Sequence, residues 1–432
     1  MKKSFILSLL FLIGLSANAQ EYSKVYLSEA IDVALKNNID LEATKLNIDI
    51  AKNKLKIANR FQNPSIDSYY FMGNSASSEP KQFGISQNIE LAKRSAKKDL
   101  AVSELKLENK KLDYSTFDLK MDVREAYVEL VAAKSVLHTL LQQKELQEEL
   151  LKIAQSRVKE KNAPTIDVIQ AEIALNQLMT QINSAKMAVK KNLAYFNKVI
   201  NSSNGIEYDS MDKLFAEENN FEEMLTPPST NKFPSVDKIV KEALEHRFDI
   251  SISKQELEIA EKELKVVIRQ KVPDIQIAGG YAYLPARDSQ SNSLEHGAYA
   301  GASLVNLPLF YNYSPEIKNA NLKILQSQLN LESTKNKAIK DVTASYEKFL
   351  TAAENLNQYE EKIMTNSADL IDISKKSYEK GEIDIVSLIV MKQSYKSIII
   401  GYTQALADYY NSWTNVLREI NNENFSLKTE KL

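Results

Sequence analysis

The chain has 432 residues, of which only ten are glycine and ten are proline. Average usage is about 7% and 5%, so a fold with many tight turns is excluded and long continuous elements are predicted. The 55 basic and 57 acidic residues nearly cancel, which leaves no bulk attraction to nucleic acid or to an anionic membrane.

The first 19 residues have the layout of a cleavable secretory signal. Lys2 and Lys3 precede an apolar run from Phe5 to Leu15, and the small-residue triplet Ala17-Asn18-Ala19 follows. Such a run is too short for a retained membrane anchor, so we predict cleavage before Gln20 and export of the rest. Because the chain contains no cysteine, it has neither disulfides nor a site for a lipid on cysteine.

The chain matches itself at a nearly constant offset. Residues 28–66 align with 237–275, with 11 identities in 39 positions, and a second block of matches follows at a slightly larger offset. We therefore predict two copies of one unit, residues 20–200 and 235–420, followed by a tail, 421–432. The joint at 201–234 combines glycine, two prolines and an acidic stretch, and is predicted to be an irregular connector.

Each copy is predicted to open with a helix of about thirty residues. Ser28 and Asp237 are the predicted N-caps, and the helices should stop near Pro64 and Pro273, because the residue before proline is driven out of the helical region. Strand pairs are predicted at 65–91 and 274–309, where apolar residues alternate with small or polar ones. Their apolar positions include Phe83, Ile85, Ile275, Ile277, Tyr281 and Tyr283.

After the strands, each copy runs without proline or glycine, over 93–163 and 316–380. At 1.5 Å per residue such helices are roughly 100 Å long, and apolar spacing near 3.5 predicts coiled-coil pairing. Return helices are predicted from Ile166 to about Val199 and from Ile385 to about Ile420. The turns between outgoing and return helices are Asn162-Ala163-Pro164-Thr165 and Gly381-Glu382-Ile383-Asp384.

Four strands of about ten residues are long enough to cross a bilayer in a tilted barrel, but too few to close one. Lipid does not tolerate an open sheet edge, so further copies of the chain would have to complete the barrel. Three copies would supply twelve strands and set the long helix pairs side by side as a helical barrel in water. The apolar strand positions would then face lipid. Alternation alone also allows a small soluble sheet covered by helices.

Several sequence features together resemble the TolC-like outer-membrane efflux family. They are the doubled unit itself, Asn306-Leu307-Pro308-Leu309-Phe310 after the last strand, and Tyr378-Glu379-Lys380-Gly381 at the second turn. The resemblance extends from about Tyr26 to Ile420. It implies a mainly α fold with a small β part, a homotrimer with a twelve-stranded β-barrel in the outer membrane, and an α-barrel in the periplasm. It also implies two partners, a periplasmic adaptor (membrane fusion protein) and an inner-membrane transporter.

The same resemblance makes the two turns the periplasmic tips, where the helices loosen to open the tunnel and the adaptor docks. In some members, acidic residues just after the second tip ring the closed aperture. Here the two matching positions are Ser387 and Val390, so such a carboxylate ring is not predicted. Asp384 and Asp167 lie nearby, and each is open to interpretation as a gate residue or as a solvent-exposed turn residue.

No other chemistry is indicated. His138, His246 and His296 are far apart in sequence, so no metal site is predicted, and no glycine-rich phosphate loop is present. We therefore predict no catalytic residues and no cofactor. The favoured function is a passive exit duct of an export system; the alternative is a periplasmic coiled-coil adaptor or scaffold without a membrane barrel. The sequence does not indicate the transported substrate.

Overall fold

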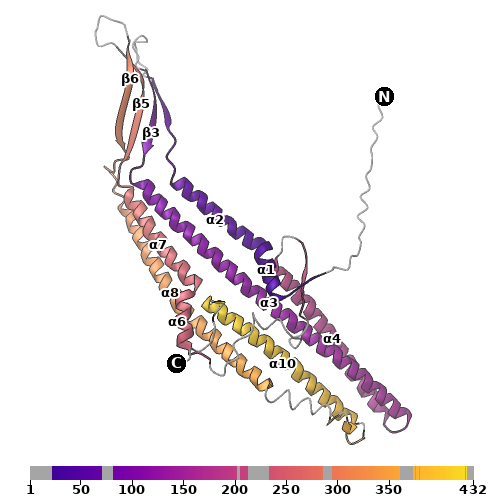
Figure 1. The fold of residues 1–432 in the computed structure, drawn as a ribbon. Helices are drawn as coiled ribbons and strands as arrows, with labels where there is room; N and C mark the ends of the chain where they lie inside the picture. Colours follow the sequence, from indigo (N-terminus) through magenta and orange to yellow (C-terminus); the bar gives the residue numbers. More distant parts are fainter. Residues whose placement is uncertain are drawn as a thin grey trace, which may run out of the picture.

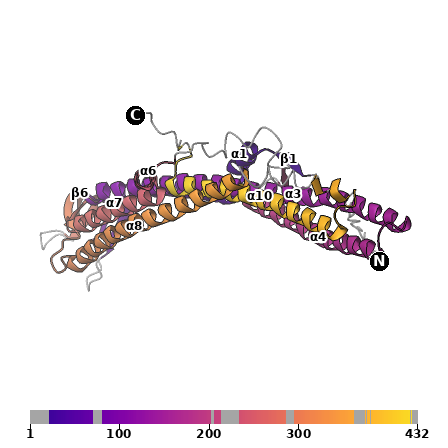
Figure 2. The same cartoon turned by 90° about the horizontal axis from the view of Figure 1, so that it is seen from below.

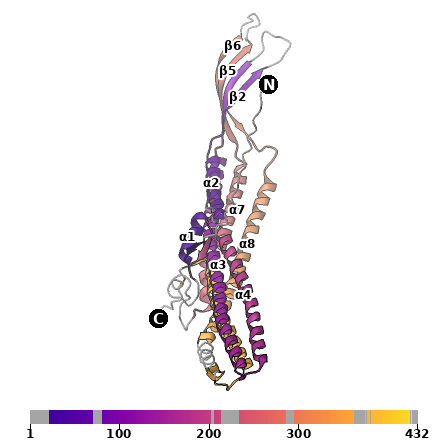
Figure 3. The same cartoon turned by 90° about the vertical axis from the view of Figure 1, so that its right-hand side faces the viewer.

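The computed structural model describes residues 22–70, 81–201, 205–212, 233–285, 294–360, 373–374, 376–378, 380–423 and 425. Over these residues the protein is elongated and mostly helical, with the main sheet at one end (Figure 1 and Figure 3). The predicted signal peptide, residues 1–19, lies outside the described residues.

The helices and strands follow each other in the order of the two predicted repeats. The helices are α1 (Leu27–Asn37), α2 (Ile39–Ala58), α3 (Lys93–Lys159), α4 (Thr165–Ile200), α6 (Val236–His246), α7 (Phe248–Arg269), α8 (Ser314–Gln358) and α10 (Ile385–Ile420). The strands are β1 (Ser23–Val25), β2 (Ser65–Tyr70), β3 (Lys81–Ile89), β4 (Tyr208–Ser210), β5 (Asp274–Pro285) and β6 (Leu294–Val305).

The strands of the main sheet and the helices joined to them lie side by side in the same order. The sheet is antiparallel, in the order β2-β3-β5-β6. In the chain, α2 leads into β2, β3 into α3, α7 into β5 and β6 into α8. The helices pack in the matching order, α2 on α3, α3 on α7 and α7 on α8, so α2 and α8 lie at opposite edges (Figure 1). Each edge of the sheet therefore continues into an edge of the helical layer.

Away from the sheet, the helical layer is rebuilt from the return helices. α4 packs along α3, while α10 packs against both α3 and α8. Figure 2 shows these helices as one bent layer running the length of the molecule. The 67 residues of α3 span both parts of this layer, which gives the helix a length of roughly 100 Å.

The predicted thirty-residue helices are wrong in one respect, because each is broken into two at a single residue. Asn38 separates α1 from α2 and Arg247 separates α6 from α7, each with an extended backbone. Neither break needs proline or glycine. The side chain of Asn38 accepts a bond from Leu41 N–H at 2.9 Å and donates to the carbonyls of Val199 and Ile200, at the end of α4.

Arg247 makes the equivalent contacts in the second repeat. Its guanidinium binds the carboxylates of Asp249 and Glu419 and the carbonyl of Glu419, near the end of α10. The nearby carboxylates of Asp249 and Glu419 raise the pKa of Arg247, so its charge is permanent. At each break, therefore, a side chain binds the end of a return helix.

The predicted helix termini also need correction. The N-caps are Tyr26 and Ser235, and the predicted caps Ser28 and Asp237 lie in the first turn instead. At the other end, α2 stops at Ala58 and α7 at Arg269, before Pro64 and Pro273 are reached. The early stop of α2 is stabilised by Arg94, whose Nε donates to the carbonyl of Asn59 at 2.8 Å.

Repeated tyrosines tie each copy together in the same way. The hydroxyl of Tyr127 donates to the carboxylate of Asp212 at 2.6 Å and lies 3.2 Å from the carbonyl oxygen of Val25, and that of Tyr346 donates to the carbonyl of Pro234 at 2.6 Å. Both rings are fully buried, each in its own hydrophobic cluster. Burial raises the pKa of Tyr346 to about 12. These paired contacts fix the segment before the first helix of each repeat.

The connector, predicted to be irregular, contains the short strand β4. It pairs in parallel with β1, with Ser23 opposite Tyr208 and Val25 opposite Ser210. Lys134 of α3 holds β4 through the Asp209 carboxylate at 2.6 Å and the Ser210 hydroxyl at 2.8 Å. Three-residue strands carry too little alternation to be recognised in a sequence.

None of the described helices is both long enough and apolar enough to cross a membrane.

Two neighbouring glycines of β5 provide a test of the strand packing. A Cβ on Gly280 would lie 2.1 Å from the backbone oxygen of Phe83 in β3, whereas a Cβ on Gly279 would meet no atom closer than 3.6 Å. Gly280→Ala should therefore disrupt β3–β5 pairing and lower the yield of folded protein. Gly279→Ala, the matched control, should leave the yield near wild type in the same quantitative immunoblot. Equal yields would contradict this packing.

Candidate functional site: the strand faces and the helical tips

The apolar strand residues gather on one face of the sheet. Residues directly opposite each other in an antiparallel pair share a face, and the β3–β5 register sets Phe83 opposite Tyr281 and Ile85 opposite Gly279. Alternation along the strands then places six predicted residues on this apolar face: Phe83, Ile85, Ile275, Ile277, Tyr281 and Tyr283. Contact of the apolar face with lipid remains a prediction.

The apolar face is open in a single chain. Ile85 is 59% exposed and Ile277 is 50% exposed, and Ile66 of β2 on the same face is 85% exposed. Such a contiguous apolar surface is typical of a contact with lipid or with another protein chain. Most of its members are large side chains, so covering the face would stabilise the sheet by the hydrophobic effect.

The opposite face of the sheet is small and polar. Gln276 bonds the hydroxyl of Ser86 at 3.2 Å and accepts from that of Ser303 at 3.5 Å, which forms a polar row across three strands. Farther along, the Tyr299 ring packs over Gly84, where a Cβ would collide with the tyrosine hydroxyl. At the helix end, the nearly buried Asp274 pairs with Lys93 at 2.7 Å. This face suits contact with water.

The two tips have the same backbone despite different sequences. In the first, Lys161 has φ +59° and the N–H of Asn162 bonds the carbonyl of Arg157 at 2.8 Å. In the second, Gly381 has φ +78° and the N–H of Glu382 bonds the carbonyl of Ser377 at 2.9 Å. This is the Schellman arrangement of a helix C-terminus.

The predicted tip residues do not occupy equivalent positions in the two turns. The first turn begins earlier than predicted, since the left-handed residue is Lys161 and Thr165 already belongs to α4. Asn162, Ala163 and Pro164 form the exposed or half-buried turn, as Glu382 and Ile383 do in the second tip. The glycine signal identified the second turn, but a lysine in the same conformation gave no signal.

The tips differ most at the N-caps of the return helices. Pro164 precedes α4 without a side-chain bond, whereas Asp384 caps α10 by accepting from the N–H of Ser387 at 2.8 Å. Hydrogen bonds from Ser387 lower the pKa of Asp384, so this carboxylate stays charged. The structure thus places Asp384 as a helix cap. Ser387 is half-buried and Val390 is 53% exposed.

A contact between the two tips was not predicted from the sequence. The guanidinium of Arg157, near the end of α3, lies 4.9 Å from the ring centroid of Tyr378 and bonds its carbonyl at 3.4 Å. Tyr378 is only 2% exposed and packs in a cluster with Leu150, Ala154, Ala171, Ile385, Leu388 and Ile389. This cluster joins residues of both repeats, which holds the two tips together.

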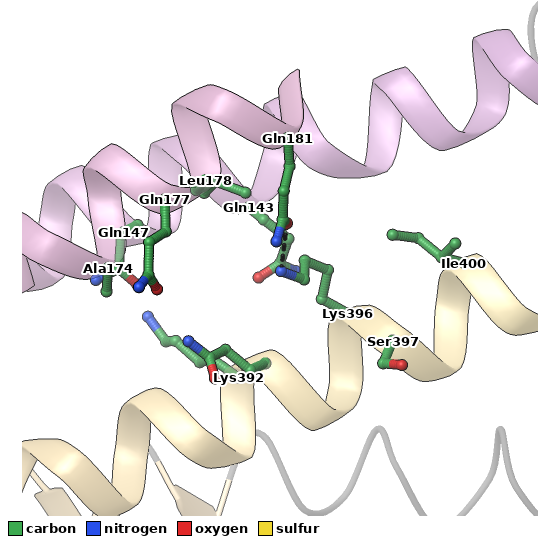
Figure 4. A pocket seen from close by; sticks show the side chains of 11 residues that line it. Gln143, Gln147, Ala174, Gln177, Leu178, Gln181, Lys392, Lys396, Ser397 and Ile400 are labelled. Carbon is green, nitrogen blue, oxygen red and sulfur yellow. Dashed lines mark hydrogen bonds between the residues drawn. The ribbon is translucent and has the colours of Figure 1, made fainter. Parts of the chain in front are cut away.

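Above the tips, a polar groove separates the first hairpin from α10. Figure 4 shows glutamines of α3 and α4 facing two lysines of α10 across a cavity of about 490 Å³. Lys396 Nζ donates to Gln181 Oε1 at 2.7 Å, and Lys392 Nζ donates to the carbonyl of Leu146 at 3.2 Å. Partial burial lowers the pKa of Lys396. These long-range contacts could not be predicted, since nothing in the sequence pairs the lysines with particular glutamines.

Among the described residues, no group of three His, Asp or Glu side chains could hold a metal ion. The arrangement offers surfaces instead: an apolar sheet face, a polar sheet face and paired helical tips.

Comparison with known proteins gives a consistent result. The outer membrane efflux protein family matches residues 30–202 and 239–422. No curated protein sequence matches the chain.

Solved structures of bacterial membrane proteins share the fold. A membrane protein from Pseudomonas aeruginosa is 14% identical and has a TM-score of 0.71, over 94% of this chain and 97% of that chain. The CmeC outer membrane channel of Campylobacter jejuni is 16% identical with a TM-score of 0.66, over 94% and 87%. The MtrE outer membrane channel of Neisseria gonorrhoeae, in its open state, is 15% identical with a TM-score of 0.71, over 95% and 92%. The predicted fold class, mainly α with a small β part in two repeats, is confirmed.

The tips provide a paired prediction. A left-handed backbone costs an ordinary residue about 1 kcal/mol relative to glycine. Gly381→Ala should therefore lower stability by about that amount, and Lys161→Gly should raise it, as measured by the thermal midpoint of the purified protein. A shift of the same sign in both variants would contradict the two left-handed turns.

The two faces of the sheet provide a further prediction. Lysine at Tyr281 or Ile277 would place a charge on the apolar face, which costs about 2–4 kcal/mol near the middle of a bilayer and less toward the loop end of the strands, where Tyr281 lies. Both variants should lose membrane-assembled protein, Ile277→Lys more than Tyr281→Lys. Gln276→Lys, on the polar face of the same strand, should be milder; if all three are tolerated equally in membrane fractions, the face assignment fails.

Proposed function

This chain belongs to the outer membrane efflux protein family, and we propose that three copies of it form a passive exit duct through the outer membrane. The strands line the membrane part of the duct and the helices extend it into the periplasm. The duct performs no bond chemistry. Energy comes from an inner-membrane transporter, coupled through a periplasmic adaptor.

The observation that carries this proposal is the pair of open edges on each chain. β2 and β6 each pair on one side only, so the sheet ends in unpaired backbone groups. On the helices that continue these strands, exposed apolar residues recur at coiled-coil spacing: Ile39, Leu46, Ile50 and Ile57 on α2, and Leu322, Leu325, Leu329 and Ile339 on α8. The α2 edge of one copy therefore fits the α8 edge of the next.

Strand number favours three copies over two. A barrel of about eight strands has an interior that side chains fill, whereas larger barrels leave an aqueous passage. Two copies of this chain would supply only eight strands. Three copies supply twelve strands, with the row of Gln276, Ser86 and Ser303 facing the lumen and the apolar face turned to lipid.

The tips and the groove above them are the surfaces for the adaptor. Both tips lie at the end of the molecule farthest from the sheet (Figure 1), where a periplasmic partner would meet them. The groove between α3, α4 and α10 presents Lys392 and Lys396 among amide groups, so it suits a helical partner carrying carboxylates. Loosening of the Arg157–Tyr378 contact would release one tip from the other.

The alternative, a periplasmic adaptor or scaffold without a barrel, has less support. It leaves the apolar face of the sheet without a role, although Ile66 and Ile85 are mostly exposed on it. It also predicts a different location, because such a protein would be recovered in the periplasmic fraction.

The α8 edge of the helical layer provides the test of the proposed duct. Leu325→Glu on α8 would place a carboxylate in the contact between copies and remove about 1.5–3 kcal/mol of burial per site. We expect wild type in the outer-membrane fraction as a heat-sensitive trimer on electrophoresis, and Leu325→Glu mainly as monomer.

Asn330→Glu is the matched control, since Asn330 is exposed on a different face of α8. It should leave the trimer intact. Recovery of wild type in the periplasmic fraction, without a trimer, would rule out the duct.

A further inference from the structure

The charged residues of the sheet are divided between its two faces. The register places Lys81 opposite Tyr283, and Tyr283 opposite His296, so all three lie on the apolar face. Asp67 lies opposite Gly84 and Asp274 opposite Val305, on the polar face. Among strand residues whose side chains the structure describes, Lys81 and His296 are therefore on the apolar face and the carboxylates on the other.

Lys81 and His296 lie at one end of the apolar band. From the row of Ile89 and Ile275 to the row of Lys81 and Tyr283 the strand advances eight residues, which is about 27 Å. With a strand tilt of 35–45°, this advance corresponds to a height of roughly 20 Å, comparable to the apolar band of a membrane barrel. The Lys81 row is at the loop end of the strands, remote from the helices.

The side chains of this end form one cluster. The rings of Tyr281 and Tyr283 are 5.3 Å apart, and the ring of His296 lies 5.7 Å from the first and 5.9 Å from the second. The Tyr281 hydroxyl bonds Nδ1 of His296, which orients the imidazole and leaves Nε2 on its other edge. Tyr281 and Tyr283 are 39% and 37% exposed, and Lys81 and His296 are also exposed.

We propose that Lys81 and His296, oriented by Tyr281 and Tyr283, bind the phosphate group of a lipid head group in the outer leaflet. This inference rests on the proposed function, which puts the helices in the periplasm and the loop end of the sheet at the outer surface. Tyrosine rings are suited to the boundary between acyl chains and head groups, and a long lysine side chain reaches from apolar surface to polar surroundings.

The location selects a lipid phosphate over a free one. The cluster continues directly into the apolar band, since Phe83 lies opposite Tyr281 in the adjacent row and Ile85 follows it. A lipid binds both parts at once, with its acyl chains on the apolar side chains and its phosphate on Lys81 and His296. A free phosphate would gain only the second contact, from two exposed groups in competition with water.

The test uses the full mature protein in detergent and follows the temperature at which its trimer dissociates. The probes are diphosphorylated lipid A, the same lipid without phosphates, and inorganic phosphate. We expect only diphosphorylated lipid A to raise the dissociation temperature of wild type. The double variant Lys81→Gln/His296→Gln should need roughly tenfold or more lipid for the same shift, because it loses the lysine charge at the lipid surface and the imidazole hydrogen bond.

Control variants separate charge from structure. Lys81→Arg keeps the cation and should respond as wild type does, and Lys335→Gln removes a lysine from α8, outside the sheet, with no effect. An unchanged response in the double variant would overturn the proposal. An equal response to inorganic phosphate, or to lipid without phosphates, would also overturn it.

The outcomes also separate this inference from the function on which it rests. If wild type forms no trimer, the duct and the lipid site both fail. If wild type forms a trimer and conducts ions in a planar bilayer, but both lipid forms act equally, the duct stands and only the lipid site fails.

Discussion

The unpaired edges of the four-stranded sheet constrain the rest of the molecule. In a sheet exposed to lipid, backbone groups must be hydrogen-bonded, and among the described residues neither β2 nor β6 has a second neighbour. Because each edge strand is continuous with an edge helix, the same lateral order holds in the helical layer, where α2 and α8 carry exposed apolar stripes. In the proposed assembly, a single arrangement of neighbouring copies would satisfy both hydrogen bonding in the sheet and hydrophobic burial in the helices.

The helices that continue the strands must keep their positions in the layer. The repeated contacts at Asn38 and Arg247 hold them there, because they tie each helix break to the end of a return helix. Each residue interrupts a helix and binds the end of the return helix of its own repeat. The return helix is thereby fixed at its end near the middle of the molecule, while its other end reaches the tip. Among the described residues, the tips are joined by the Tyr378 cluster and by Arg157.

The sequence predicted the features that depend on periodicity and missed those that depend on single long-range contacts. Repeat, strand pairs and long helices follow from spacing, so their order was predictable, and glycine marked the turn at Gly381. Asn38 and Arg247 break helices through partners more than 160 residues away, at Ile200 and Glu419, which no local pattern indicates. Lys161 adopts a left-handed conformation that is unfavourable for lysine, because the Schellman bonds of the turn hold it there.

The two repeats share a backbone and have diverged in the side chains of their tips. Equivalent turns carry Pro164 in one tip and the capping carboxylate of Asp384 in the other. The first hairpin supplies Arg157 and the glutamines of the groove, and the second supplies Tyr378 and the two lysines. Contacts between the hairpins therefore join unlike groups. The two repeats thus keep the same backbone at their tips, while the side chains that join the hairpins differ between them.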